Sequence, residues 1–352
     1  MYALKIQKIL NQIDRVDSAE EKVKLVLQAI AIADENHDLE WGYDLRLDLL
    51  NYEIDLAFSP ESLPAFAWIL QTYDENPELF NEEDFLWQYK WMMSDLYENP
   101  DVSKAQIEAA LKDFETRLLR NGYGMRAIYN EEFSEALAQK DTTAIQESLT
   151  KVLSVERDDM SDCLACEMDA EVSAILYTQG FTAAYAKATP LFEKKFTCAH
   201  VPLRTAVNLA YEGQKLGFSE QAAKAAELAS TEILLKEKEK SITLSAIKLA
   251  LYYAYTDKKK GKEWLEKYIP WVDGREDRTV FYVAKFVVDA LKEYPADEVF
   301  HLELPETHQL FKGDTVFTKT ELQDNYAAIA QRIAAKFDQR NGNAHFSNQL
   351  IA

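Results

Sequence analysis

Apolar residues recur along most of this chain at the spacing of an α-helix rather than at the alternation of a β-strand. The first such stripe consists of Leu4, Ile6, Ile9, Leu10 and Ile13. Short breaks that contain proline or glycine separate the later stripes, for example at residues 59–60 and 121–124. The pattern predicts an all-α protein made of helices joined by short turns.

A local echo in the middle of the chain indicates how these helices are organised. The run Gly-Phe-Thr-Ala-Ala from Gly180 recurs as Gly-Phe-Ser-Glu-Gln from Gly217, and each glycine lies between two apolar helical stretches. Repeats of about 20–50 residues are typical of solenoids, because one unit cannot bury its apolar face without its neighbours. We therefore expect an α-solenoid of stacked antiparallel helical hairpins.

From residue 163 onward, the spacing resembles the tetratricopeptide repeat. Leu209-Ala210, Gly217 and Ala222 stand where that family has small or apolar residues, the turn glycine and a second small residue. The resemblance implies a right-handed superhelix with a concave groove that binds peptides or protein partners. The first helix of each pair would line this groove, and its edge would include Tyr177, Asn208, Tyr211 and Tyr252.

The same pattern divides the chain into three parts. Residues 1–124 are predicted to form acidic helical pairs, residues 125–293 the tetratricopeptide-like repeats, and residues 294–352 a connector with a C-terminal capping helix. The helix is expected over Lys319–Arg340, because Asn341-Gly342-Asn343 is a strong stop signal.

Charge narrows the class of partner. The net charge is −21, and residues 51–100 contain eleven acidic residues against the single base Lys90. Such a surface repels phosphate backbones, so we expect a protein or peptide partner, preferably basic, and no nucleic acid. The lysines between residues 236 and 262 mostly alternate with glutamate or lie in a turn, and these we interpret as a solvated face.

The N-terminal residues lack an apolar signal core, and no segment contains 18 consecutive apolar residues. The three cysteines are an odd number in a large chain, which suits a reducing compartment. We therefore expect a cytoplasmic protein without a membrane span.

The cysteines form the sharpest candidate for chemistry. Cys163 and Cys166 make a Cys-x-x-Cys pair, and Cys198 with His200 could complete the ligand set of a structural zinc ion. One alternative is that the small cysteine side chains pack at helix crossings, which is favoured because cysteine is among the most often buried residue types. The other alternative is redox chemistry. The cysteine block also resembles one in uncharacterised bacterial tetratricopeptide-like proteins, which implies a bacterial source and no activity.

Asp158, Asp159 and Asp162 match the Asp-Asp-x-x-Asp motif of all-helical isoprenoid synthases, which bind a diphosphate through Mg²⁺. A second acidic motif is missing from the sequence. Acids also gather before a helix because they favour its positive end, and this second interpretation is the stronger one.

Aromatic residues suggest a second contact surface. Trp87 and Trp91 lie one helical turn apart, next to Glu82, Glu83 and Asp84. They could form a binding ridge or belong to the core.

The sequence lacks a Gly-rich phosphate loop, His-Glu-x-x-His and Gly-x-Ser-x-Gly. We therefore expect no enzyme and no cofactor other than the possible zinc ion. The function expected is an adaptor, a regulator or an inhibitor, for example of a basic toxin or nuclease. The alternatives are a Mg²⁺-dependent diphosphate enzyme and a zinc-stabilised structural module.

Overall fold

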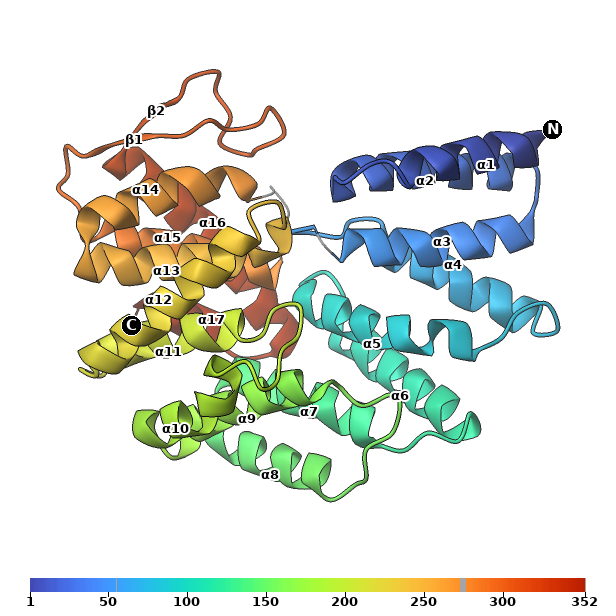
Figure 1. Ribbon diagram of the computed structural model, residues 1–352, viewed down its shortest axis with the longest axis horizontal. Helices are drawn as coiled ribbons and strands as arrows, with labels where there is room; N and C mark the ends of the chain where they lie inside the picture. The colour runs from blue at the N-terminus through green and yellow to red at the C-terminus, as the bar shows by residue number, and fades with distance from the viewer. Residues whose placement is uncertain (55, 273–276, 352) are drawn as a thin grey trace. The chain divides into compact units, whose positions relative to one another are not determined.

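The computed structural model describes residues 1–54, 56–272 and 277–351. Helices account for 72% of the protein, and the described residues contain one sheet of two strands. The predicted fold class is confirmed, since consecutive helices pack against one another in an all-α, solenoid-like arrangement (Figure 1). None of the described helices combines the length and the hydrophobicity needed to cross a bilayer.

The chain forms two compact units. Unit 1 consists of residues 1–96, 107–123 and 238–241, and unit 2 of residues 97–106, 124–237 and 242–352. The first six helices are α1 (Tyr2–Ile13), α2 (Ala19–Glu35), α3 (Leu39–Glu53), α4 (Ser62–Glu75), α5 (Glu83–Glu98) and α6 (Lys104–Arg120). The C-terminal end of α5 and the N-terminal end of α6 belong to unit 2.

The other α-helices belong to unit 2. They are α7 (Arg126–Gln139), α8 (Thr142–Leu153), α9 (Leu164–Thr178), α10 (Phe181–Phe192), α11 (Leu203–Lys215), α12 (Ser219–Leu235), α13 (Thr243–Thr256), α14 (Lys258–Tyr268), α15 (Arg278–Leu291), α16 (Lys319–Asn341) and α17 (His345–Ile351). The 3₁₀ turns are η1 (Lys240–Ile242) and η2 (Ile269–Trp271).

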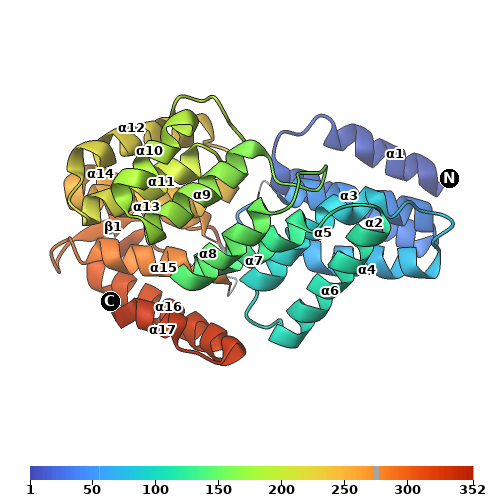
Figure 2. The same ribbon diagram turned by 90° about the horizontal axis from the view of Figure 1, so that it is seen from below.

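Unit 2 is built as two layers of helices. The first helices of successive pairs, α7, α9, α11, α13 and α15, contact one another in chain order (Figure 2). The second helices, α8, α10, α12, α14 and α16, each pack on the first helix that precedes them. The layer of first helices therefore presents a surface to which several successive pairs contribute.

Local sequence explains the turns within these pairs. Gly180 and Gly217 have φ angles of 96° and 84°, a conformation that side chains with a Cβ rarely adopt. They separate α9 from α10 and α11 from α12, so the echo seen in the sequence marks two equivalent hairpin turns. In the α7–α8 turn, the Asp141 carboxylate caps α8 by accepting hydrogen bonds from the backbone N–H groups of Thr143 and Ala144 at 3.0 and 3.1 Å.

The C-terminal segment contains more structure than the predicted connector and helix. Strands β1 (Val299–His301) and β2 (Val316–Thr318) pair antiparallel, and Phe300 and Phe317 face each other in this pair, both buried. Helix α16 ends at Asn341, and the following Gly342, with a φ of 68°, confirms the predicted stop. The sequence did not indicate the additional helix α17, and the three-part division of the chain stays a prediction.

Candidate functional site

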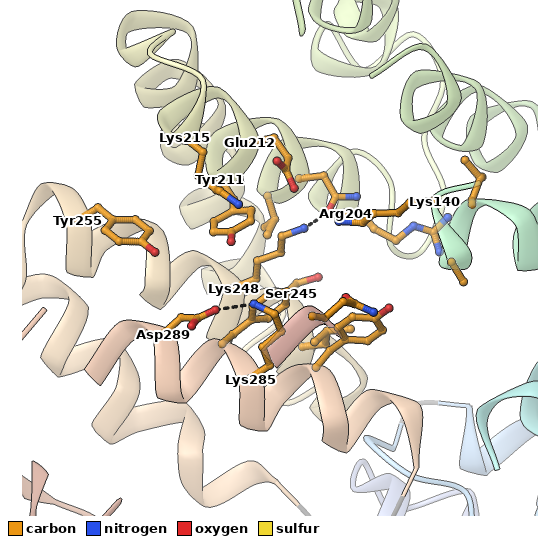
Figure 3. Close-up of a pocket in the computed structure, with 18 of the residues that line it drawn as sticks. Lys140, Arg204, Tyr211, Glu212, Lys215, Ser245, Lys248, Tyr255, Lys285 and Asp289 are labelled. Atoms are coloured by element: carbon orange, nitrogen blue, oxygen red, sulfur yellow. Dashed lines mark hydrogen bonds and ion pairs between the residues drawn. The ribbon is translucent and has the colours of Figure 1, made fainter. Parts of the chain in front are cut away.

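A pocket of about 540 Å³ opens on the layer of first helices in unit 2 (Figure 3). Its lining comes from α7, α9, α11, α13 and α15, from the residues that directly follow α7 and α15, and from one residue of α17. Pockets that bind small molecules have volumes of about 300–1,000 Å³. This one is therefore large enough to enclose a ligand, and several helical pairs shape it.

The charge of the pocket is opposite to that of the chain. Six basic and three acidic side chains line it, an excess of three positive charges, in a protein whose net charge is −21. The basic residues are Lys140, Arg204, Lys215, Lys248, Lys285 and Lys292, and the acidic ones are Glu212, Asp289 and Glu293. The local field thus favours a negatively charged ligand.

Lys248 lies among these charges and extends into the pocket from α13 (Figure 3). Its ammonium donates a hydrogen bond to the Asn208 side-chain oxygen at 2.6 Å and lies 5.1 and 5.5 Å from the ring centroids of Tyr211 and Phe286. In the described part of the chain it forms no salt bridge. Burial lowers the pKa of Lys248 to about 8, and the nearby lysines lower it further against the opposing effect of Glu212.

The other bases differ in how far their charge is already neutralised. Lys285 and Lys292 both bind Asp289, at 2.6 and 2.8 Å, and the half-exposed Arg204 binds the buried Asp169 at 2.6 Å. These three bases are thus already held by carboxylates.

Two further lysines resemble Lys248. Lys140 and Lys215 form no salt bridge among the described residues, and their ammonium groups lie 5.4 and 5.2 Å from the rings of Tyr177 and Tyr211. Together with Lys248, the pocket therefore contains three cations without a carboxylate partner in the described chain.

Tyrosines supply the remaining chemistry of the lining. Burial raises the pKa of Tyr177 and Tyr211, and it raises the pKa of the more exposed Tyr255 to about 12. All three stay neutral at physiological pH and can donate a hydrogen bond to an anion while their rings contact apolar groups. Such side chains suit a ligand that is partly charged and partly apolar.

Three of the four residues predicted at the groove edge come together here. Tyr177, Asn208 and Tyr211 line the pocket, whereas Tyr252 is 5% exposed and packs against the neighbouring Tyr253. The interpretation of the lysines between residues 236 and 262 as a solvated face does not hold for Lys248, whose partly buried side chain lines the pocket. The missed signal was that Lys248 is the one charged residue of the fourteen in α13.

The second predicted contact surface belongs to unit 1. Trp87 and Trp91 are half-buried and meet edge to face, with ring centroids 6.5 Å apart. Glu83 and Asp84 are exposed, whereas Glu82 is 4% exposed.

Glu82 is held by α6 and the residue that follows it. It accepts hydrogen bonds from Arg117 at 2.8 Å and Asn121 at 2.7 Å, and it also binds Arg120. A carboxylate held in this way stabilises the packing of α6 and has little capacity left for a partner.

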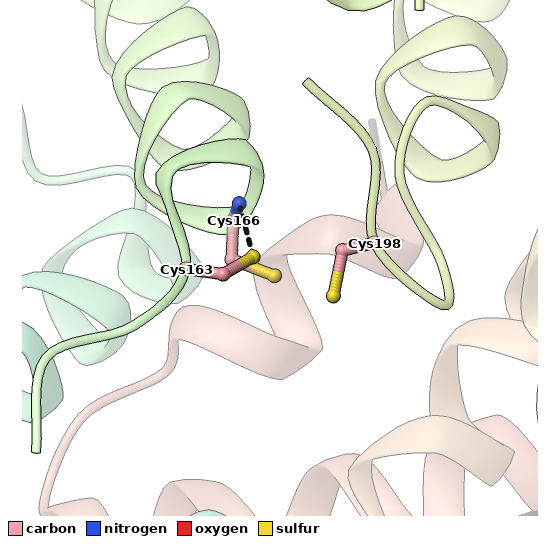
Figure 4. A group of neighbouring side chains, drawn as sticks. All are labelled: Cys163, Cys166 and Cys198. Carbon is pink, nitrogen blue, oxygen red and sulfur yellow. Dashed lines mark hydrogen bonds between the residues drawn. The ribbon is translucent and has the colours of Figure 1, made fainter. Parts of the chain in front are cut away.

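The structure also brings the three cysteines together, and their sulfur atoms all lie within 4.8 Å of one another (Figure 4). Cys163 and Cys166 lie at the start of α9, and Cys198 lies in the loop between α10 and α11. His200, the predicted fourth ligand, is not a member of this group.

The aspartates of the Asp-Asp-x-x-Asp run lie in the turn between α8 and α9. Asp158 accepts hydrogen bonds from the backbone N–H groups of Gly124 at 2.7 Å and Met160 at 3.1 Å. Among the described residues, no group of three carboxylates converges at this turn. The local role of Asp158 is to shape the turn.

The chain was compared with known protein families, with characterised proteins and with solved structures, and none of these comparisons gives a match. The ligands of this chain must therefore be inferred from the geometry of the pocket and of the cysteine cluster.

Proposed function

We propose that this chain is a protein-interaction module of the tetratricopeptide type, whose pocket in unit 2 holds a negatively charged segment of a protein partner. The resemblance in the sequence implies a groove lined by first helices. The pocket lies on that layer and draws its walls from five successive first helices.

The observation that carries the proposal is the Lys248 ammonium, which contacts Asn208 and two aromatic rings but forms no salt bridge within the described chain, although Glu212 lies near enough to affect its pKa. A cation removed from bulk water is costly unless an anion compensates it. An acidic side chain or a terminal carboxylate of a peptide supplies such an anion, and the tyrosines accommodate its apolar neighbours.

The proposed ligand differs in sign from the basic partner expected from the net charge. That expectation rested on the chain as a whole, whereas the pocket has a local excess of positive charge. A basic surface of the same partner fits the acidic residues outside the pocket. A basic protein with one acidic segment would therefore match both the positive pocket and the negative charge of the rest of the chain.

The test is a binding screen against fluorescein-labelled short peptides that differ in charge, measured by fluorescence anisotropy. We expect acidic peptides with interspersed aromatic or aliphatic residues to bind, with affinity that falls as salt is raised. Lys248→Met should weaken the best binder by about tenfold or more, which corresponds to about 1.4 kcal/mol or more.

The matched control is Lys259→Met, because Lys259 is 89% exposed and does not line the pocket. This variant should bind as the unmodified protein does. If the best binders were basic, or if both variants bound them equally, the pocket would not be the peptide site.

A further inference from the structure

All the cysteines of this chain meet at one place. The sequence contains three, and their sulfur atoms lie within 4.8 Å of one another although Cys166 and Cys198 are far apart in the chain. Thiolates that bind one tetrahedral zinc ion at about 2.3 Å lie about 3.8 Å from each other. Small side-chain rotations would bring the three sulfur atoms to that spacing.

Hydrogen bonds hold the backbone on both sides of the cluster. Cys163 caps α9, and its sulfur accepts a hydrogen bond from the backbone N–H of Cys166 at 3.4 Å. On the opposite side, Cys198 and Val201 exchange two backbone hydrogen bonds, of 3.0 and 3.3 Å, which close the loop into a tight turn. Two hydrogen-bonded segments thus present their thiols to a common point (Figure 4).

The cluster is open to solvent and lies beside a positive charge. Cys163 and Cys198 are exposed, so an ion can reach the sulfur atoms without local unfolding. Arg204 lies close enough to Cys166 for their charges to interact. A divalent cation with three thiolates carries one net negative charge, and this guanidinium, although it also binds Asp169, would stabilise that charge.

We propose that Cys163, Cys166 and Cys198 bind one thiophilic divalent cation, with zinc as the prime candidate, through three thiolates, and that solvent occupies the fourth position. Binding releases the three thiol protons to the buffer and leaves the oxidation state of every atom unchanged. The ion would fasten the start of α9 to the loop before α11. This inference is independent of the peptide proposed for the pocket.

The experiment uses the full chain, purified without a metal-affinity tag and kept reduced. We expect elemental analysis to find about one zinc per chain, and Co²⁺ added to the metal-free protein to give the near-ultraviolet absorption of thiolate-to-cobalt charge transfer. Removing zinc with a chelator should lower the Tm of the reduced protein, because the ion binds the folded state.

Three variants locate the site. Cys198→Ser should lose the stoichiometric zinc and most of the cobalt absorption, while His200→Ala should retain both. Leu164→Ser changes an exposed residue between two ligands and should also retain both. Circular dichroism checks that each variant keeps its helices, and the cobalt titration of the unmodified chain tests the site even if Cys198→Ser fails to fold.

Several results would overturn the proposal. Reduced protein that binds neither zinc nor cobalt would exclude a metal site. A disulfide in protein isolated under reducing conditions would identify the cluster as a redox pair with a spare thiol. Loss of the metal in His200→Ala would contradict a site of three thiolates.

Discussion

Replacing Lys248 with methionine should make unit 2 more stable and its pocket less able to bind. The burial that lowers the Lys248 pKa from its usual 10.5 to about 8 disfavours the charged form in the folded protein. At 1.36 kcal/mol per pKa unit, this difference corresponds to about 3 kcal/mol. Losing the hydrogen bond to Asn208 costs about 1 kcal/mol, so the net gain at pH 7 should be about 2 kcal/mol.

The stability effect of Lys248→Met should also depend on pH, which gives a second, independent test of this prediction. Below pH 8, Lys248 is charged in both the folded and the unfolded protein, and the full cost of burying its charge is present. Between about pH 8 and 10.5 the unfolded chain still binds the proton that the folded protein has lost, so the stability contributed by this residue rises with pH. The advantage of Lys248→Met should therefore shrink as the pH is raised from about 7 toward 10.

Urea unfolding followed by circular dichroism measures the free energy of unfolding at each pH. Hydrogen exchange of peptides from α13 and α15 should locate the change in unit 2. The exposed variant Lys259→Met should leave the stability nearly unchanged. If Lys248→Met were destabilising at pH 7, or if its effect were the same at pH 7 and pH 9.5, then the burial of the Lys248 charge would not cost the folded protein stability.

Three further predictions concern the scaffold around the pocket. Gly217→Ala should lower the free energy of unfolding in urea by about 1–2 kcal/mol, and Gly217→Asn should lower it by less, because Asn tolerates the positive φ better. A larger loss with Asn than with Ala would contradict this reason. Arg278→Met should cost about 3 kcal/mol or more, since it leaves Glu98 and Glu135, each 2.8 Å from the guanidinium, without their counterion; thermal melting that is unchanged at pH 7 would refute it. Asp169→Asn should cost about 2 kcal/mol in urea unfolding because this buried carboxylate accepts hydrogen bonds from Arg204 and Thr205, and an unchanged midpoint would count against that role.

The helical hairpins could be predicted because their causes are local. Gly180 and Gly217 mark turns that need a positive φ, and the apolar stripes follow the helical period. The antiparallel strands around Phe300 and Phe317 were missed because each has three residues, too few for an alternating pattern to stand out.

The pocket depends on contacts between helices that are far apart in the sequence. Tyr177, Asn208 and Tyr211 could be proposed because residues at matching positions of repeated first helices share one surface. The role of Lys248 could not be predicted from the sequence. Whether this lysine forms a salt bridge depends on how α11 and α15 pack around it. The convergence of Cys198 on Cys163 likewise required the path of the loop between α10 and α11.

The layer of first helices has a mechanical consequence. In an array in which each helical pair holds mainly its neighbours, the ends can open while the middle stays folded. The pocket takes residues from five first helices and from the C-terminal helix α17, so a ligand seated in it would connect members of the array that are not sequence neighbours. A bound ligand would then couple the unfolding of these pairs, so that an array whose ends fray one pair at a time would unfold in one cooperative step.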